Sequence, residues 1–311
     1  MRRATNGILV LLWAALTLGQ GQKPSSEPAA RMVGIQMRNV NLRIERDIVL
    51  QIRRLHGRMD PTRSDRPVTL DDRRSFDVEV DSAVIAIDTA SLSRLLNSYI
   101  FAYAGAPLKN MSVTIKGGRL VQKGTMHKGI DLPFQVEGSV SATDNGAIRL
   151  HAEKIASAHI PFKGLLHLFG EDLSKLVNVN EARGVRIEGD DILLFPDRMT
   201  PPPHIKGRVM DARIEGGNVV EVFGGSRPPE TMRLPAGASN YIYHRGGLLR
   251  FGKLTMTDAD LEIIDANPRT PLDFSLDDYN RQLVAGYSKN TPSHGLIVHM
   301  PDYGQLVRER R

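Results

Sequence analysis

Apolar and polar residues alternate one by one along several stretches of this sequence, and this period of two constrains the fold more than any other feature. In 76–80, Phe and Val occupy every second position and acids lie between them. The same alternation recurs in three later stretches, 111–115, 134–140 and 148–152. Successive side chains of a strand point to opposite faces, so each stretch predicts a strand with one face in a core and the other in water. This pattern is typical of antiparallel sheets.

Glycine pairs punctuate these strands. Gly117-Gly118, Gly216-Gly217 and Gly246-Gly247 each follow one strand-like stretch and precede another, and Asn145-Gly146 does the same. Gly and Asn tolerate the positive φ angles that tight hairpins require, so each pair predicts a hairpin turn. A glycine-rich loop around a phosphate is the alternative, but the short spacing between strands favours the hairpin.

Two segments follow a helical period instead. The first carries an apolar stripe of Leu92, Leu95, Leu96, Tyr99, Ile100 and Tyr103. Asp88 or Thr89 is its expected N-cap, and Gly105 its expected end. The second begins at Pro161, a residue favoured in the first turn of a helix. Its stripe contains Phe162, Leu165, Leu166 and Phe169. Both segments are predicted to be amphipathic helices that lie against a sheet.

The first 21 residues are typical of a secretory signal peptide. Arg2 and Arg3 form a basic start, an apolar run covers 8–18, and Gly19 and Gly21 suit a cleavage site. A bilayer-spanning helix needs about 20 apolar residues, so cleavage is expected rather than an uncleaved anchor. The mature protein is then expected outside the cytoplasm, in the periplasm or cell envelope.

Proline-rich punctuation suggests how the rest of the chain is divided. We expect a flexible leader at 22–34, a β/α domain at 35–225, a linker at 226–238 and a small β-rich extension at 239–311. Within the extension, a short helix is predicted at 278–285 and a last strand at 296–300. The extension is either a separate subdomain or an addition to the edge of the same sheet.

Several kinds of chemistry are excluded or unsupported by the residues. The chain has no Cys, which rules out disulfides, thiolate metal sites and cysteine nucleophiles. Its nine His residues lack the spacing of a metal-binding motif, and no Gly-x-Ser-x-Gly elbow occurs. Residues 247–253 have phosphate-loop spacing, but Leu254 stands where a hydroxyl is required. We therefore expect no metal, no cofactor and no enzymatic activity.

The charge balance argues against nucleic acid as a partner. Without residues 1–21, the 41 Lys and Arg fall to 39, against 35 Asp and Glu. The acids are interleaved with the bases, so no long basic stripe is expected.

A cluster of acids leaves one catalytic alternative open. Asp258, Asp260 and Asp265 lie close together in the sequence. Paired carboxylates can serve acid–base hydrolysis when they are held at the right separation. A hydrolase that combines Asp258, Asp260 and a distant His is therefore one functional hypothesis, and the one ranked last.

The order of these features over 35–223 resembles a known family. A helix SLSRLLNSYI is followed by MSVTIKGGRLVQKG, LPFQVEGSVSATDNGAIRLHAEKI, HIPFKGLLHLF, GVRIEGDDILLFP and HIKGRVMDARIEGGNVVEVF. This series is similar to the bacterial exported phospholipid-binding proteins grouped with the mycobacterial lipomannan elongation and maintenance factor, which are TULIP-like lipid-binding modules. The resemblance implies an α+β fold in which a long curled antiparallel sheet packs around two amphipathic helices.

The resemblance also implies a function. Phospholipid or another acyl-chain ligand would lie in an apolar groove, and the fold would allow peripheral contact with a membrane. The groove residues expected on this basis are Leu92, Leu95, Leu96, Tyr99, Ile100, Tyr103, Phe162, Leu165, Leu166 and Phe169. The alternative is that these side chains pack together in an ordinary hydrophobic core and leave no groove. The competing function is a non-enzymatic envelope adaptor that binds a protein partner, of unknown identity, through sheet edges or the C-terminal extension.

Overall fold

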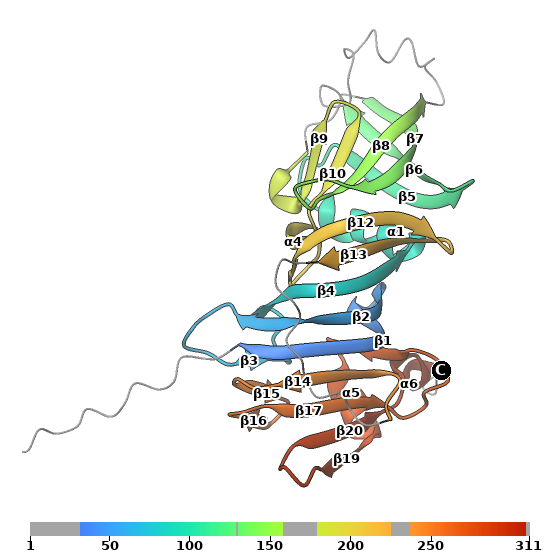
Figure 1. Ribbon diagram of the computed structural model, residues 1–311. Helices are drawn as coiled ribbons and strands as arrows, with labels where there is room; N and C mark the ends of the chain where they lie inside the picture. Colours follow the sequence, from blue (N-terminus) through green and yellow to red (C-terminus); the bar gives the residue numbers. More distant parts are fainter. Residues whose placement is uncertain (1–31, 129, 158–178, 225–236, 309–311) are drawn as a thin grey trace, which may run out of the picture.

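The computed structural model describes residues 32–128, 130–157, 179–224 and 237–308, and most of these residues are in β-strands. Figure 1 shows a long, curled sheet that runs through the molecule, with a second sheet at one end. The expectation of a mostly β chain with an open, curled sheet is confirmed. The residues expected as signal peptide, and most of the expected leader, lie outside the described residues.

The long sheet has eleven strands. Nine form a continuous path in the order β12-β13-β4-β2-β1-β14-β17-β20-β19, while β11 pairs with β4 and β18 pairs with β1. Their bounds are β1 Val33–Glu45, β2 Ile48–Pro61, β4 Phe76–Asp88, β11 Ile205–Lys206, β12 Arg208–Glu215, β13 Asn218–Gly224, β14 Tyr241–Arg245, β17 Asp260–Asp265, β18 Leu272–Ser275, β19 Tyr287–Asn290 and β20 Leu296–Met300.

Two smaller sheets complete the β-structure. The second sheet has the order β5-β6-β7-β8-β10-β9, and the third has the order β16-β15-β3. Their bounds are β3 Val68–Thr69, β5 Leu108–Lys116, β6 Arg119–Lys128, β7 Ile130–Ala142, β8 Ile148–Ser157, β9 Val185–Glu188, β10 Asp191–Leu194, β15 Leu249–Phe251 and β16 Leu254–Met256.

The helices of the described residues are short. They are α1 Thr89–Leu95, the π-helix η1 Leu96–Ile100, the 3₁₀ turn η2 Glu181–Arg183, α4 Pro196–Met199, α5 Tyr279–Ala285 and α6 Tyr303–Arg308. The first predicted helix is confirmed as α1 and η1. Asp88 is its N-cap, because the Asp88 carboxylate accepts a hydrogen bond from the Ser91 N–H at 2.6 Å. The helix ends at Ile100, earlier than Gly105. The second predicted helix, beginning at Pro161, lies outside the described residues.

Four strand pairs depart from the predicted antiparallel arrangement. The pairs β1–β18, β4–β11, β3–β15 and β17–β20 are parallel, and the remaining pairs are antiparallel. Parallel neighbours require a crossover connection. In the pair β17–β20, the intervening chain contains β18, α5 and β19.

The glycine pairs act in two ways. Gly117-Gly118 joins β5 to β6, and Gly216-Gly217 joins β12 to β13, each with positive φ at both residues, so these two hairpins are confirmed. The third prediction, a hairpin at Gly246-Gly247, is wrong. That pair also has positive φ, but β14 pairs with β17 whereas β15 pairs with β16 and β3. Here the turn moves the chain from one sheet to another.

Most strands beyond residue 240 belong to the long sheet, whereas β15 and β16 form the third sheet with β3. β14 pairs with β1 along its whole length, and β18 runs parallel to the second half of β1. The predicted helix at 278–285 is confirmed as α5, and the predicted last strand as β20. Of the two arrangements considered for this part of the chain, the strands β14, β17, β18, β19 and β20 follow the second, an extension of the same sheet.

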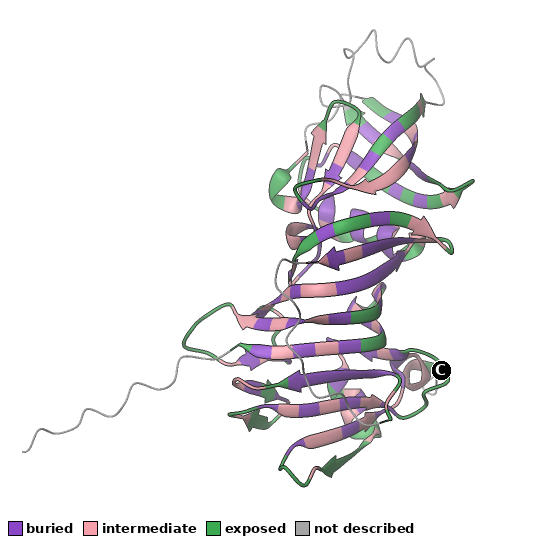
Figure 2. Ribbon diagram, in the orientation of Figure 1, coloured by how far each residue is buried: buried purple, intermediate pink, exposed green. Residues whose placement is uncertain are grey.

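The long sheet and the second sheet meet at the outer strand β12. The Val209 N–H donates to the Gly146 carbonyl at 3.2 Å, and the Arg208 guanidinium donates to the Asp144 carbonyl. These contacts place β12 beside the turn between β7 and β8. Figure 2 shows buried residues alternating with more exposed ones along the strands on both sides of this junction. The two sheets therefore share one apolar interior here, covered by α1 and η1.

Candidate ligand-binding site

The α1–η1 segment is held to both sheets by polar side chains. The Ser91 hydroxyl accepts a hydrogen bond from the Val49 N–H at 3.2 Å, which fixes α1 to β2. The Ser93 hydroxyl accepts from the Val113 N–H at 2.8 Å, which fixes α1 to β5. Because these bonds use backbone groups of the two sheets, they set the position of the helix, and with it the direction of its leucine side chains.

An apolar cavity lies between this helical segment and the two sheets. Counted together with its opening to solvent, the space is about 720 Å³, of which about 50 Å³ can hold the centres of water-sized molecules. A single water needs about 10–15 Å³ on the latter measure. The side chains that meet here therefore leave part of the interior unfilled.

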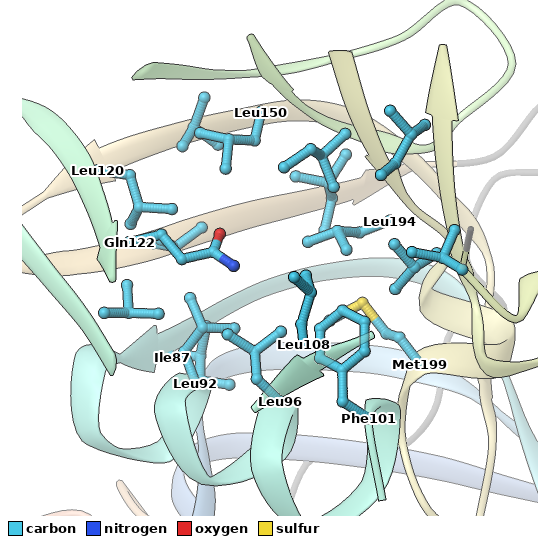
Figure 3. Close-up of a pocket in the computed structure, with 18 of the residues that line it drawn as sticks. Ile87, Leu92, Leu96, Phe101, Leu108, Leu120, Gln122, Leu150, Leu194 and Met199 are labelled. Atoms are coloured by element: carbon cyan, nitrogen blue, oxygen red, sulfur yellow. The ribbon is translucent and has the colours of Figure 1, made fainter. Parts of the chain in front are cut away.

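All six strands of the second sheet contribute to the lining, together with β4 and β13 of the long sheet. Figure 3 shows Leu150 on one side, Leu92, Leu96 and Phe101 on another, and Leu194 and Met199 at one end. The lining residues are Ile87, Leu92, Leu96, Phe101, Leu108, Val113, Leu120, Gln122, Val140, Ile148, Leu150, Val179, Val185, Ile187, Ile192, Leu194, Met199, Val219 and Glu221.

Two lining residues are polar, and both are buried. Gln122 on β6 is 7% exposed, and Glu221 on β13 is 8% exposed. Neither side chain forms a hydrogen bond or an ion pair with another described residue. In Figure 3 the amide of Gln122 points into the middle of the cavity. The cavity thus carries two polar groups whose hydrogen-bonding capacity the described protein leaves unused.

Burial changes the acidity of Glu221. Desolvation raises the pKa of its carboxyl to about 7, because the ionised form is disfavoured in an apolar environment. On the same strand, Val219 and Phe223 belong to the main core, so residues with this parity point inward. Glu221 opposes Ala212 and Ile85 on the neighbouring strands, and both are also in the core.

The leucine and isoleucine residues predicted for the groove on the first helix fall into two groups. Leu92 and Leu96 line the cavity. Leu95 and Ile100 are buried in the core but do not line the cavity. Phe101, which lies off the predicted stripe and directly follows the π-helix η1, does line it.

Tyr99 and Tyr103 have a different position from the one expected for groove residues. They are partly buried and hold the segment just after residue 178. The Arg183 guanidinium lies 5.1 Å from the centre of the Tyr99 ring, and the Tyr103 hydroxyl accepts a hydrogen bond from the Asn180 N–H at 3.3 Å. These contacts keep Val179 at the cavity wall. The other predicted groove residues, Phe162, Leu165, Leu166 and Phe169, lie outside the described residues.

Sequence reasoning did not identify Gln122 and Glu221, although the sequence contains a signal for each. Gln122 follows Leu120 at the same parity, and Glu221 stands between Val219 and Phe223 in NVVEVF. A polar residue at an inward position of an alternating strand is unusual, because its burial costs free energy unless it is hydrogen-bonded. That exception to the alternation is the signal that could have found both residues.

The acids considered for hydrolysis are placed differently. Asp260 accepts hydrogen bonds from the Tyr243 hydroxyl at 3.0 Å and the Ser293 hydroxyl at 3.4 Å, and lies 3.1 Å from Arg245. Asp258 is exposed and precedes β17. Among the described residues, no group of three or more His, Cys, Asp or Glu side chains could hold a metal ion.

No helix within the described ranges has the length and apolar character needed to cross a bilayer. Comparison with known proteins gave no match, since no family model, curated protein or solved structure is significantly similar to this chain. The family resemblance drawn from the order of sequence features therefore stays a prediction.

Proposed function

We propose that this chain is an exported binding protein that holds the acyl chain of a lipid, or another apolar molecule, in the cavity between α1–η1 and the two sheets. One observation carries the proposal. The cavity is lined almost wholly by aliphatic side chains, and the described residues do not fill it.

The energetics of the cavity favour hydrocarbon. Each methylene moved from water into such a site contributes about 0.8 kcal/mol. Binding of this kind needs no nucleophile. The only titratable group that the described lining residues supply is Glu221, and we propose a role without catalysis.

The export signal and the TULIP-like arrangement are part of the proposal. The basic start and short apolar run of residues 2–18 support the export signal. The position of α1–η1 against a long curled sheet, whose strands are mostly antiparallel, supports the TULIP-like arrangement. Release from the membrane after cleavage would place the cavity where envelope lipids are accessible.

Native mass spectrometry of the protein purified without detergent tests the proposal. We expect a co-purifying apolar molecule at one copy per chain, which organic extraction removes and identifies. A wholly ligand-free protein that also fails to take up a fluorescent fatty acid would contradict the proposal.

A pair of matched variants shows whether the ligand lies in this cavity. Val140→Phe adds volume inside the cavity, so the variant should lose the ligand. Ile155→Phe, on the next strand of the same sheet, is the control, because Ile155 is also partly buried and packs against a separate apolar cluster. Equal loss in both variants would mean that the ligand is lost through general destabilisation.

A second candidate function, the envelope adaptor, is favoured by the exposed edge at β19. All four residues of β19 are exposed, and in the described part of the chain this strand pairs only with β20. Tyr287 on this strand is 54% exposed, and Val284 on the preceding helix α5 is 87% exposed. An unpaired edge can accept a strand from a partner.

Deleting the C-terminal part of the chain would not test the adaptor, because β14 and β18 pair with β1. Point changes at the edge are the better experiment. If the edge binds a partner, Val284→Asp combined with Tyr287→Ser should abolish site-specific crosslinks from position 288 to an envelope protein. The Val140→Phe variant should keep those crosslinks.

A further inference from the structure

We infer that the apolar ligand of this cavity carries a hydroxyl group on its hydrocarbon body, and that Glu221 and Gln122 bind this hydroxyl. The inference rests on the proposed function, because it concerns the same cavity. The observation behind it is the presence of two buried, unpaired polar side chains from different sheets in one apolar cavity.

A buried polar group without a hydrogen-bond partner raises the free energy of the protein. A ligand that forms a hydrogen bond with such a group removes this cost and therefore binds more tightly. A buried donor or acceptor without a partner costs more than a typical hydrogen bond contributes. Glu221 and Gln122 are each more than nine-tenths buried, and neither is paired with a described residue. A ligand with no polar atom would leave this cost in place, whereas a ligand with a suitable group would remove it.

The chemistry of the two side chains selects a hydroxyl. An ionised carboxylate only accepts hydrogen bonds, a protonated carboxyl also donates one, and a primary amide does both. Because burial places the pKa of Glu221 at about 7, both of its forms are present near neutral pH. A hydroxyl can donate to the ionised form and accept from the protonated form, so it is matched in either state. An ether oxygen only accepts, so it pairs with Glu221 in the protonated state alone.

The charges at the cavity exclude an anionic group at this position. No Lys, Arg or His occurs among the described lining residues, so nothing there would neutralise a carboxylate or phosphate next to Glu221. Two like charges in an apolar site strongly disfavour each other. The anionic headgroup of a lipid would therefore lie at the opening, while the hydroxyl lies inside.

Competition between two small ligands tests the inference. Octanol and octyl methyl ether share one alkyl chain, but only the alcohol can donate a hydrogen bond. Each would be titrated against the full-length mature protein loaded with N-phenylnaphthylamine, whose fluorescence reports apolar sites. We expect octanol to compete on the order of tenfold more strongly than the ether, the factor that one additional hydrogen bond typically provides.

Three variants identify the residues responsible. Glu221→Leu combined with Gln122→Leu should reduce the preference for octanol to less than twofold, while ether binding is kept. Glu221→Gln, which keeps a donor and an acceptor, should retain the preference. Glu137→Leu is the control, because Glu137 pairs with Lys154 and does not line the cavity.

The outcomes separate the two proposals. If neither octanol nor the ether displaces the probe, the proposed function fails. If both displace it equally in the unchanged protein, the hydroxyl inference fails and the proposed function stands. A preference that survives in the double Leu variant also overturns the inference, provided that circular dichroism shows the variant to be folded.

Discussion

The side-chain amide of Asn97 bonds both backbone groups of Met111, accepting from its N–H at 2.8 Å and donating to its carbonyl at 2.7 Å. The pairing of β5 with β6 shifts register between Lys109 and Ser112, so Met111 has no partner in that ladder. Asn97 thus completes the hydrogen bonding of a bulged edge strand and fixes η1 beside the cavity.

We expect Asn97→Ala to destabilise the protein by about 2 kcal/mol. The change leaves a backbone donor and acceptor of the buried Met111 unpaired, and each such group costs about 1–3 kcal/mol, less where water can reach it. Urea unfolding measures the difference. Ser98→Ala is the control, because Ser98 is exposed on the same helical turn. Equal stability of the two variants would show that the Asn97 bonds contribute nothing.

Glu221 should make the protein less stable as pH rises. Its pKa is raised by burial from 4.5 to about 7, so the folded state binds the proton more tightly than the unfolded state. Stability from this group is therefore complete below about pH 4.5 and is lost as the pH rises to about 7. At about 1.4 kcal/mol per tenfold change in proton affinity, the loss is on the order of 3 kcal/mol.

The comparison of wild type with Glu221→Gln isolates this effect, because the change removes the titration and nearly preserves the shape. The difference in unfolding free energy between the two proteins should favour the variant progressively from pH 4.5 to 7. A difference that is independent of pH would mean that Glu221 does not titrate in this range.

His244 should act in the opposite direction. Burial lowers the pKa of its ring to about 4 from 6.5, partly opposed by the Leu261 backbone. The unfolded state then binds the proton more tightly, so stability is complete above about pH 6.5 and is lost as the pH falls to about 4. The difference in unfolding free energy between His244→Phe and wild type should therefore favour the variant more at pH 5 than at pH 7.5. Parallel stability curves for the two proteins would contradict this assignment.

The strands predicted from the sequence were those with uninterrupted alternation, and β1 and β2 show why others were missed. Along β1 the buried residues fall at odd positions up to Met37 and at even positions from Val40. Asn39, with a φ of 49°, lies at the break. In β2 the change occurs around Arg53, opposite this point. A bulge keeps one face in the core while it reverses parity, so a search with a fixed period of two fails there.

The cavity was only partly predictable for a different reason. Leu92 and Leu96 were found because a helical stripe is a local signal. Gln122 and Glu221 are about a hundred positions apart in the chain, and they share a cavity only because β12 lies beside the turn between β7 and β8. The same holds for the pairing of β1 with β14 and β18, which spans more than 190 residues. Such pairings depend on tertiary packing, which a single sequence does not encode in any local period.

Tyr279 links the last part of the chain to the first, and Tyr279→Phe should therefore lower stability by about 2 kcal/mol. The Tyr279 hydroxyl donates to the Asp71 carboxylate at 2.7 Å and accepts from the Gly252 N–H at 2.8 Å. Hydrogen bonds to charged groups contribute about 1.5–3 kcal/mol, and the Tyr279 ring keeps its stacking on Phe251 in the variant.

Tyr287→Phe is the matched control, because that residue is 54% exposed. Urea unfolding should remain a single transition in both variants, since β14 and β18 pair with β1. If Tyr279→Phe instead produces a separate early transition, the C-terminal strands unfold independently of the long sheet.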